Sequence, residues 1–455
     1  MSPSKIHYEA PRVAAKPGET VVTSTCAHNC GGRCAVNAHV RDGRIVKIST
    51  DPRRWTPEMP PLHACVRGFG QLERVNHPDR LMHPLRRTGP RGSGQFQRVS
   101  WDDALDEVAR EMRRIRDTYG PAAILDCSRT GSLSTLHGRG VSQRFINMFG
   151  GCTELWSNLS AEAEIFAVKQ TYGAKAEYKS AGREPIDYVN SRLIVMWGWS
   201  PGDGTFGTGT MKQAVAPMGE CRNDFDICTE LARRLGIAGY NDKTEDEWLR
   251  ELTGGVIDDF DTFRERGLAR LPAPDDAVAF AREIRDPERH PFSTPSGKIE
   301  IYSMTLAARP DPYGLGAIPP IPMWIEDEID ARYPLRLVTP KSRARTHSIR
   351  DNQPILSRAD ADEVWINTAD AAARGIVDGQ RVRVFNARGT THLPARVTDR
   401  IAPGVVSIKE GAWFTPDAAG ADTRGCANVL IADRTSPAGA APFNSCFVDI
   451  APALP

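Results

Sequence analysis

Hydrophobic and polar positions alternate near the N-terminus in a way that predicts a small β unit. Residues 21–25 and 35–40 alternate, and residues 45–48 continue the pattern. Asp42-Gly43 lies between the last two segments and is a two-residue hairpin signal, because both residues tolerate positive φ. The sequence therefore predicts a β unit over residues 20–50, with a loop between its first two strands.

Residues 101–119 carry the first clear helical pattern. Ser100 can cap this helix, with Asp103 three residues on, and Gly120-Pro121 ends it. The apolar residues expected on one stripe of the helix are Leu105, Val108, Met112 and Ile115.

After this helix, strand and helix patterns alternate. A short buried strand is expected at residues 122–126 and another at residues 192–197, with helices at about 140–148 and 161–172 between them. Such alternation is typical of a parallel, doubly wound sheet.

The alternation then stops. The next patterns are all helical, at residues 224–235, 245–252 and 275–284, and no convincing strand follows until residues 298–302. A parallel sheet needs a crossover and then another strand. The sheet begun at residue 122 is therefore predicted to be unfinished.

The last part of the chain, from about residue 334, is rich in short strands separated by turn signals. A short helix is expected at residues 370–374, and the whole segment predicts a closed barrel. The expected strands are residues 335–339, 363–367, 381–386, 390–397 and 405–409.

Charge and composition narrow the function classes. Lys plus Arg is 58 and Asp plus Glu is 57, which gives no electrostatic case for nucleic acid or an anionic membrane as partner. No apolar run approaches the length of a membrane span. Residues 1–19 lack an apolar signal core and a twin-arginine pair, so a cytoplasmic location is expected, where cysteines serve as thiols or metal ligands.

Four of the ten cysteines gather in one constellation. Cys26, Cys30 and Cys34 lie on one loop, and Cys65 follows far along the chain. Gly31-Gly32 lets the loop backbone wrap closely. Three thiolates from one loop and one from a distant turn are typical of a 4Fe–4S cluster, whereas a zinc site usually takes two pairs. Zinc and four buried thiols remain the alternatives.

At these cysteines the chain resembles the molybdopterin oxidoreductases of the dimethyl sulfoxide reductase family, especially their cluster-bearing catalytic subunits and the pyrogallol hydroxytransferase-like subunits. The similarity covers nearly all of the chain. The motifs that carry it are Cys65-Val-Arg67-Gly68, His77-Pro-Asp-Arg-Leu-Met-His-Pro84, Leu85-Arg-Arg-Thr-Gly-Pro-Arg-Gly92, Phe96-Gln-Arg-Val-Ser-Trp-Asp102, Gly150-Gly151, Asn158-Leu-Ser160-Ala-Glu-Ala163, Gly198-Trp-Ser-Pro-Gly-Asp203 and Thr294-Pro-Ser-Gly-Lys-Ile-Glu-Ile-Tyr302.

The resemblance implies an α/β multidomain fold. It consists of a small β iron–sulfur domain, a truncated doubly wound α/β domain and a C-terminal β-barrel of the double-psi type. The expected domains are an N-terminal 4Fe–4S domain at 1–85, a partial molybdopterin-binding domain at 86–213, a mostly helical remnant of the central domains at 214–330, and a dinucleotide-binding barrel at 331–455.

The same resemblance implies a molybdenum atom held by two molybdopterin guanine dinucleotides. Ser160 matches the position of the protein's ligand to molybdenum, although it could simply cap the following helix, and Ser157 is the fallback. Arg67 matches the basic residue between cluster and pterin, although a lone arginine is more often a surface residue.

Further cofactor contacts are expected on two segments. A glycine-rich loop after a buried strand exposes backbone N–H groups to phosphate. On that loop the candidates are Trp197, Gly198, Ser200 and Thr205. In the barrel the resemblance implies Thr339, Lys341, Arg343, His347, Ser348, Asn428 and Asn444.

The middle of the chain looks shortened relative to the family. Thr208-Gly-Thr-Met211 matches one region, and Pro217-Met-Gly-Glu220 already matches another that lies far downstream in the family. Two functions therefore compete: oxygen-atom transfer on an S-oxide or N-oxide with electrons passing through the cluster, or an electron-transfer remnant that binds pterin poorly. Hydroxytransferase-like activity on a phenolic substrate is a further alternative. A small-molecule substrate and an iron–sulfur partner subunit are expected.

Overall fold

The computed structural model describes residues 13–26, 34–54, 56, 61, 63–128, 136–156, 159–173, 191–195, 212–266 and 280–453. The chain forms two compact units. The first comprises Met1–Leu155 and Leu193–Pro272, and the second comprises Trp156–Arg192 and Ala273–Pro455. The predicted division into four domains stays a prediction.

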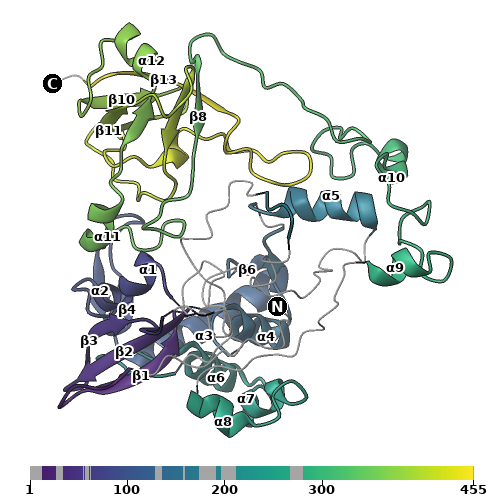
Figure 1. Cartoon of the computed structure of the whole chain (residues 1–455). Helices are drawn as coiled ribbons and strands as arrows, with labels where there is room; N and C mark the ends of the chain where they lie inside the picture. Colours follow the sequence, from purple (N-terminus) through teal and green to yellow (C-terminus); the bar gives the residue numbers. More distant parts are fainter. Residues whose placement is uncertain are drawn as a thin grey trace. The chain divides into compact units, whose positions relative to one another are not determined.

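The first unit begins with the predicted β unit. Strands β1 (Thr20–Thr25), β2 (Ala35–Arg41) and β3 (Arg44–Ser49) form an antiparallel sheet in that order (Figure 1). Asp42 and Gly43 have φ values of 49° and 71°, as the hairpin signal requires. The buried side chains of this sheet form one apolar core with two cysteines: Cys26, Cys34, Val36, Ala38, Val40, Ile45 and Ile48.

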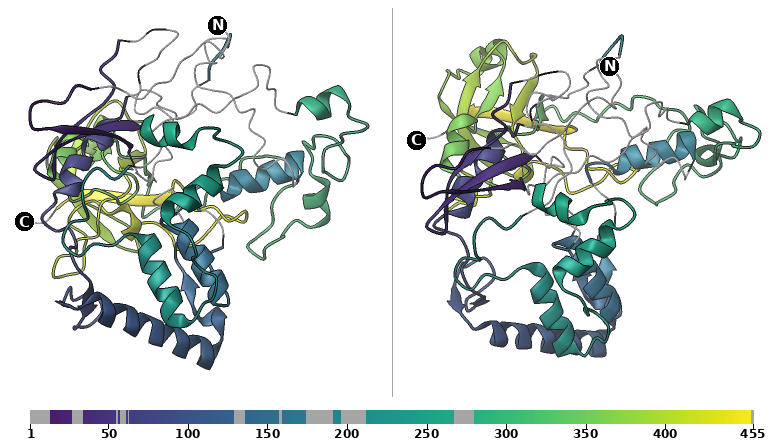
Figure 2. Two further views of the ribbon diagram at one scale, coloured as in Figure 1. Left: turned by 90° about the horizontal axis from the view of Figure 1, so that it is seen from below. Right: turned by 60° about the horizontal axis from the view of Figure 1, so that its bottom comes forward.

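Three helices build the second core of the first unit. They are α3 (Trp101–Tyr119), α4 (Arg139–Phe149) and α6 (Asp224–Leu235), and they lie side by side in Figures 1 and 2. Ser100 caps α3 as predicted, because its hydroxyl accepts a hydrogen bond of 3.0 Å from the Asp103 N–H. Their buried residues include Leu105, Ala109, Val141, Phe145, Ile146, Phe149, Leu231 and Ala232.

Shorter elements complete the first unit. Strands β4 and β5 pair antiparallel, whereas β6 and β7 pair in parallel over only two residues each. Their bounds, with those of the remaining helices, are β4 Leu85–Arg87, β5 Phe96–Arg98, β6 Leu125–Asp126, β7 Thr153–Glu154, α1 Val66–Phe69, α2 Gln71–Val75, α7 Glu245–Thr253 and α8 Phe260–Arg266.

The buried strand predicted at residues 192–197 is wrong over its described part. Residues 191–195 form no strand, and Leu193 is 79% exposed. Ile194 and Val195 are exposed as well. In the described ranges the parallel sheet consists of β6 and β7 alone. Because two-residue strands offer few backbone partners, an apolar sequence there gains little from extending the sheet.

The second unit contains the predicted barrel. Its strands close in the order β10-β11-β9-β12-β8-β13. Of these, β8, β10, β11 and β13 are labelled in Figure 1. Strand β9 pairs in parallel with β11, and β8 pairs in parallel with β12, whereas the other neighbouring strands pair antiparallel. The strands are β8 Leu335–Val338, β9 Val364–Ile366, β10 Arg381–Phe385, β11 Thr390–Val397, β12 Val405–Ile408 and β13 Cys446–Pro452.

Short helices accompany the barrel. The predicted helix at residues 370–374 is α12 (Thr368–Ala373), and the one at 161–172 is α5 (Glu162–Tyr172). Only α9 (Ala281–Arg285) represents the helix expected at residues 275–284, whose first part lies outside the described residues. The remaining helices are α10 Met304–Ala308 and α11 Pro354–Ala359.

The strand predicted at residues 298–302 is also wrong. The side-chain alternation is inverted there: Glu300 is 6% exposed, whereas Ile299 and Ile301 point to solvent. The Glu300 carboxylate accepts backbone N–H bonds of 2.9 Å from Ser296 and from Met304. A buried carboxylate with two backbone donors outweighs the burial of two isoleucines at this position.

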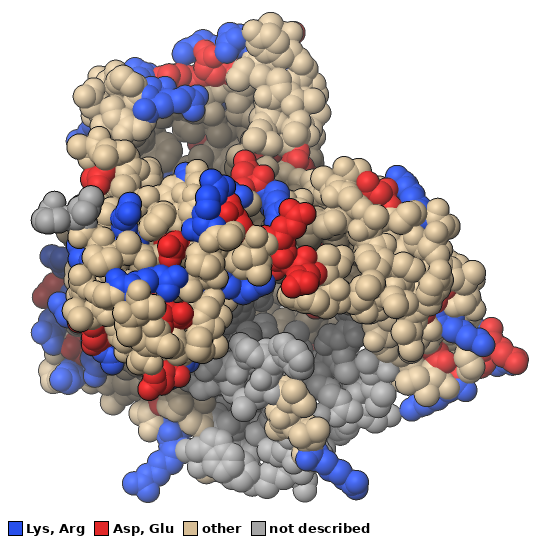
Figure 3. Space-filling view, turned by 90° about the horizontal axis from the view of Figure 1, so that it is seen from above, with Lys and Arg blue, Asp and Glu red and all other residues tan. Residues whose placement is uncertain are grey.

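On the face shown in Figure 3, acidic and basic side chains lie interspersed. Among the helices of the described ranges, none has the length and apolar character needed to cross a membrane.

Candidate cluster and pterin sites

The base of the cysteine loop is held by the β1–β2 pairing. Cys26 follows β1 and Cys34 precedes β2, and the Cys26 N–H donates to the Cys34 carbonyl at 2.8 Å. Both side chains are buried. The hairpin therefore brings the two ends of the loop together. Cys30, which belongs to residues 27–33 between them, lies outside the described residues.

Cys65 is the N-cap of the short helix α1, and the neighbouring Ala64 packs against the core that contains Cys26 and Cys34. Gln71, in the next helix α2, donates a hydrogen bond to the Cys26 sulfur at 3.5 Å. Gly68 allows this turn, because a Cβ on it would lie 2.6 Å from the Ala64 Cβ. The residues around Cys65 are thus connected to the sheet that carries Cys26 and Cys34.

Arg67 sets the electrostatics of Cys65. Its Nε donates to the Cys65 sulfur at 3.3 Å. Burial raises the pKa of Cys65, but the hydrogen bond and charge of Arg67, with the backbone N–H groups of Gly68 and Arg67, lower that pKa below its usual value. The thiolate is the form that binds iron, so this environment suits a metal ligand.

These residues fit an iron–sulfur cluster in their chemistry. Cys26 and Cys34 lie at one loop base, and Gln71 and Arg67 donate hydrogen bonds to sulfur, as donors around a cluster do. Within the described ranges no three His, Cys, Asp or Glu side chains are grouped as metal ligands.

Ser160 is exposed and lies just before α5, whose first residue is Glu162. The N-cap of α5 is Ala161, whose methyl group makes no capping hydrogen bond. The neighbouring Leu159 carbonyl accepts the Ala441 N–H at 3.1 Å. A Cβ on Gly439 would meet the Trp156 ring at 2.6 Å, so glycine permits this approach. The segment of Ser160 therefore lies against residues 439–441.

Asn444 connects the same loop to the end of β8. Its side-chain oxygen accepts the Thr339 N–H at 3.1 Å, and its carbonyl accepts from Arg336 at 3.1 Å. Two of the predicted contact residues, Thr339 and Asn444, thus meet directly. Both belong to the unit that also contains Ser160.

Lys341 and His347 meet over Glu410. The Lys341 ammonium lies 2.8 Å from a Glu410 oxygen and 3.3 Å from His347 Nδ1. His347 has a φ of 52°, and Gly411 has a φ of 94°. A Cβ on Gly411 would overlap the His347 carbonyl oxygen, so only glycine allows the two backbones to approach.

A buried ionic frame holds the segment of His347 and Ser348. Arg345 is 3% exposed and pairs with Asp351 at 2.9 Å and with Asp362 at 2.7 Å. Trp413 donates its indole N–H to the Ser348 carbonyl at 2.6 Å. Because the frame fixes the backbone on both sides, the polar groups of His347 and Ser348 are presented in one arrangement.

Arg343 and Asn428 are exposed on segments that buried carboxylates anchor. The Arg343 N–H donates to Asp360 at 2.9 Å, and Lys409 pairs with the same carboxylate. Burial raises the pKa of Asp360, but Lys409, Ser342 and the Arg343 N–H lower it below its usual value. Asn428 lies two residues after Cys426, whose N–H donates to the buried Asp422 at 2.8 Å.

The predicted contacts on the glycine-rich loop, Trp197, Gly198, Ser200 and Thr205, lie outside the described residues, as does the fallback ligand Ser157.

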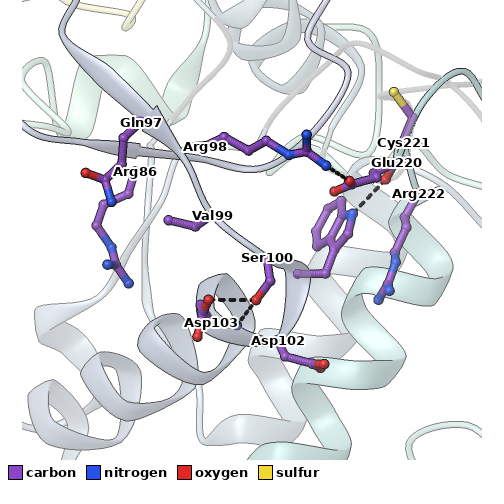
Figure 4. Close-up of a pocket in the computed structure, with 11 residues that line it drawn as sticks. Arg86, Gln97, Arg98, Val99, Ser100, Asp102, Asp103, Glu220, Cys221 and Arg222 are labelled. Carbon is purple, nitrogen blue, oxygen red and sulfur yellow. Dashed lines mark hydrogen bonds and ion pairs between the residues drawn. The ribbon is translucent and has the colours of Figure 1, made fainter.

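A cavity of about 780 Å³ in the first unit contains none of the predicted site residues (Figure 4). Figure 4 shows Arg98 reaching Glu220, and Arg86 pairs with Glu107. The Arg222 guanidinium lies 5.0 Å from the centre of the Trp101 ring. Since two of its three arginines are already neutralised, we assign this cavity no ligand.

Three protein-family models match the chain. The Molybdopterin oxidoreductase Fe4S4 domain matches residues 19–77, and Molybdopterin oxidoreductase matches residues 80–205. The Molydopterin dinucleotide binding domain matches residues 335–447. The chain belongs to the molybdopterin oxidoreductase family.

Curated relatives are S-oxide and N-oxide reductases. The chain is 38% identical to dimethyl sulfoxide reductase of Escherichia coli (strain K12) over 243 residues, which are 50% of this chain and 30% of that protein. It is 38% identical to biotin sulfoxide reductase of Cereibacter sphaeroides over 250 residues, 50% and 33% of the two chains. It is 32% identical to that organism's dimethyl sulfoxide/trimethylamine N-oxide reductase over 286 residues, 57% and 32% of the two chains. The chain thus spans about a third of these relatives.

A solved structure shares the fold. Acetylene hydratase from Pelobacter acetylenicus matches with a TM-score of 0.61 at 15% identity, covering 95% of this chain and 100% of that chain. These matches confirm the predicted family, the mixed α/β fold with its C-terminal barrel, and the predicted kinds of cofactor: a 4Fe–4S cluster and molybdenum with pterin dinucleotides.

Sequence reasoning missed the residues that support the sites. Arg345 pairs with Asp362, Glu410 with Lys341 and Asp422 with Thr391 across 17, 69 and 31 positions of the sequence, so no local spacing reveals these contacts. Gly411 had a signal, because it follows a predicted strand in a Glu-Gly turn.

Proposed function

We propose that the chain takes part in the two-electron reduction of an S-oxide or N-oxide, which consumes two protons and yields the sulfide or amine and water. Its family and the named activities of its curated relatives support this reaction. When bound, the molybdenum cofactor would accept the oxygen atom, and the cluster would supply electrons.

The chain's own residues have distinct roles in this proposal. Cys26, Cys30, Cys34 and Cys65 hold the cluster, and Arg67 favours the Cys65 thiolate. Ser160 is the side chain offered to molybdenum. The observation that supports this role is that Ser160 lies in the region matched by the molybdopterin oxidoreductase family model, at the position where the sequence analysis expects the molybdenum ligand.

The barrel residues orient the pterin dinucleotide in the proposal. Lys341, His347 and Ser348 sit on a backbone that the Arg345 frame fixes, so they would bind the cofactor without reorganising. Thr339, Arg343, Asn428 and Asn444 supply further hydrogen-bonding groups.

Cofactor analysis tests this function directly. Purified chain from an anaerobic preparation is assayed for iron, sulfide, molybdenum and pterin, and then for dimethyl sulfoxide and trimethylamine N-oxide reduction with a dye donor. Molybdenum near one per chain with turnover supports the proposal. A loaded chain that reduces neither substrate contradicts it, and a phenolic substrate provides the hydroxytransferase comparison.

A second candidate is an electron-transfer remnant that keeps the cluster but binds pterin weakly. The observation that favours it is the exposed, unpaired segment at residues 193–195, together with the chain's coverage of about a third of its relatives. Iron and sulfide without molybdenum would support this reading. An iron–sulfur partner subunit would then exchange electrons with the cluster of this chain, and co-purification of such a subunit would test this.

A further inference from the structure

Residues 212–215 are attached to the cysteine-bearing sheet of the first unit. The Lys212 N–H donates to the Ser24 hydroxyl at 2.9 Å, and that hydroxyl donates back to the Lys212 carbonyl at 3.1 Å. One side chain thus satisfies both backbone groups of a residue that lies 188 positions away. Ser24 is two residues before Cys26.

The residues after Lys212 differ in their burial. Gln213 is exposed, while Ala214 and Val215 pack against the apolar core that contains Cys26 and Cys34. Lys212 is therefore fixed by hydrogen bonds, and Ala214 and Val215 add apolar contact beside the cysteines.

The segment is anchored at both ends. The Lys212 ammonium donates to the Glu265 carbonyl at the end of α8, and burial lowers the pKa of Lys212. Farther along, the Glu220 N–H donates to the Met82 carbonyl at 2.8 Å, and Trp101 donates its indole N–H to the Glu220 carbonyl at 2.6 Å. Anchors on both sides keep the chain between them close to the sheet.

These contacts lie where the sequence passes directly from one family region to a distant one. We propose that residues 212–215 cover the side of the cluster domain next to Cys26 and Cys34, and that Ser24 is the positioning residue that latches this cover. The inference rests on the cluster in the proposed function. Its consequence is restricted solvent access to the cluster, a property that affects cluster stability and reduction potential.

The first test measures cluster loss. Wild type and Ser24→Ala are loaded anaerobically, and the decay of visible absorption is followed after excess bipyridyl is added. Ser24→Ala removes both hydrogen bonds to Lys212, so the cover opens more often. We expect cluster loss to accelerate about tenfold, which corresponds to about 1.4 kcal/mol.

Two variants distinguish loss of the Ser24–Lys212 hydrogen bonds from a general destabilisation of the sheet. Ser24→Thr keeps a hydroxyl and should restore the wild-type rate. Ser49→Ala is the matched control, because Ser49 lies on the same sheet, is equally half-buried and bonds His39 at 2.8 Å rather than Lys212. An unchanged rate in Ser24→Ala, or equal acceleration in Ser49→Ala, would overturn the proposal.

A second pair keeps the test decisive if Ser24→Ala does not fold. Val215→Ser removes apolar contact from the cover but leaves the Ser24 bonds, whereas Val46→Ser changes an exposed valine of β3. Only Val215→Ser should accelerate cluster loss. Equal rates for the two variants would contradict the cover.

Amide exchange tests the latch without any cluster. The Lys212 N–H of the wild-type chain should exchange as slowly as the paired amides of β1, and exchange at the rate of open coil would refute the latch. Iron and sulfide analysis reports separately whether the cluster itself is present, so failure of the cofactor proposal and failure of the latch are distinguishable.

Discussion

Asp422 is a buried carboxylate on which a whole loop of the barrel depends. One oxygen accepts from the Thr415 N–H at 2.9 Å. The other accepts from the Thr391 hydroxyl at 2.6 Å and from three successive backbone N–H groups, those of residues 424–426. Asp422 has no exposed surface, so water cannot replace these bonds.

Replacing Asp422 by Asn keeps the shape and removes the charge. The amide group must then face at least one N–H donor, and the remaining oxygen accepts its bonds without charge. A buried donor left unmatched costs about 1–3 kcal/mol, and a bond to a charged group is worth more than one to a neutral group. We therefore expect Asp422→Asn to lower the free energy of unfolding by about 3 kcal/mol.

The pH dependence of this loss has a definite sign. Burial raises the pKa of Asp422, but the hydrogen bonds from Thr391 and the backbone outweigh burial and leave that pKa below its usual value. A carboxyl with a depressed pKa in the folded state stabilises the protein above its unfolded pKa of about 3.9. That stabilisation is lost as the pH falls through the folded pKa.

The assay is urea unfolding of the full chain, with hydrogen exchange in β10–β13 as the local readout. The matched control is Asp417→Asn on the same loop, because Asp417 is exposed and accepts only the N–H groups of Ala419 and Ala421. The wild-type advantage over Asp422→Asn should hold near pH 7 and shrink below about pH 4. Equal stability of the two variants, or a gap that does not change with acid, would refute the reasoning.

Three further predictions concern the sites. Cys34→Ala should abolish the brown colour and lower bound iron, whereas Cys127→Ala, an exposed cysteine outside the constellation, should leave both unchanged; iron and sulfide assays decide it. Gly411→Ala should destabilise the barrel by several kcal/mol, because the added Cβ overlaps the His347 carbonyl, and it should weaken pterin retention. The control is Gly404→Ala, because Gly404 has a φ of 78° but open space around it; this variant should lower the free energy of unfolding in urea by only about 1–2 kcal/mol. Ser160→Ala should change the X-ray absorption of bound molybdenum, because the proposed ligand oxygen is removed; an unchanged spectrum in a loaded variant would remove Ser160 as ligand.

Local signals predicted most of the regular elements. The helix at residues 101–119 and the one at 224–235 have the bounds that the sequence indicates, since each has a capping side chain at its start and a glycine at its end. The barrel strands follow from short alternating segments between turn residues. Strand β13 was missed, although it closes the barrel: turn residues such as Pro442 and Asn444 precede it and its burial alternates, so a local signal was present.

Elements whose fate depends on distant partners were predicted poorly. Residues 192–197 are apolar enough for a strand, but residues 191–195 form none beside the two-residue strands of the described sheet. The sequence at 298–302 alternates between polar and apolar residues as a strand would. In the structure, however, Glu300 is the buried residue, because two backbone N–H groups donate to its carboxylate. Periodicity reports which residues are apolar, whereas burial is decided by the partners that the fold supplies.

The residues of the candidate sites also fall into those that local sequence signals predict and those that depend on distant partners. Cysteine spacing is a local property of the chain, and the predicted cluster was confirmed at the level of its domain. The residues that make the segment of His347 and Ser348 rigid, such as Arg345 and Gly411, act through buried ion pairs and a close backbone approach. The turn signal at Gly411 does not reveal this approach, so a structure is needed to find it.

The helix α6 bears on whether a chain with the predicted shortened middle can fold. It follows the point where the sequence analysis predicts a skip to a distant family region, and its Leu231 and Ala232 are buried in one core with Leu105 of α3 and Phe145 of α4. Arg234 adds ion pairs to Asp102 and Asp106 of α3 at 2.5 and 2.7 Å. An apolar helix face that would otherwise contact water is covered by residues beyond the junction. The α3, α4 and α6 helices therefore form one core although α6 lies on the far side of the predicted junction.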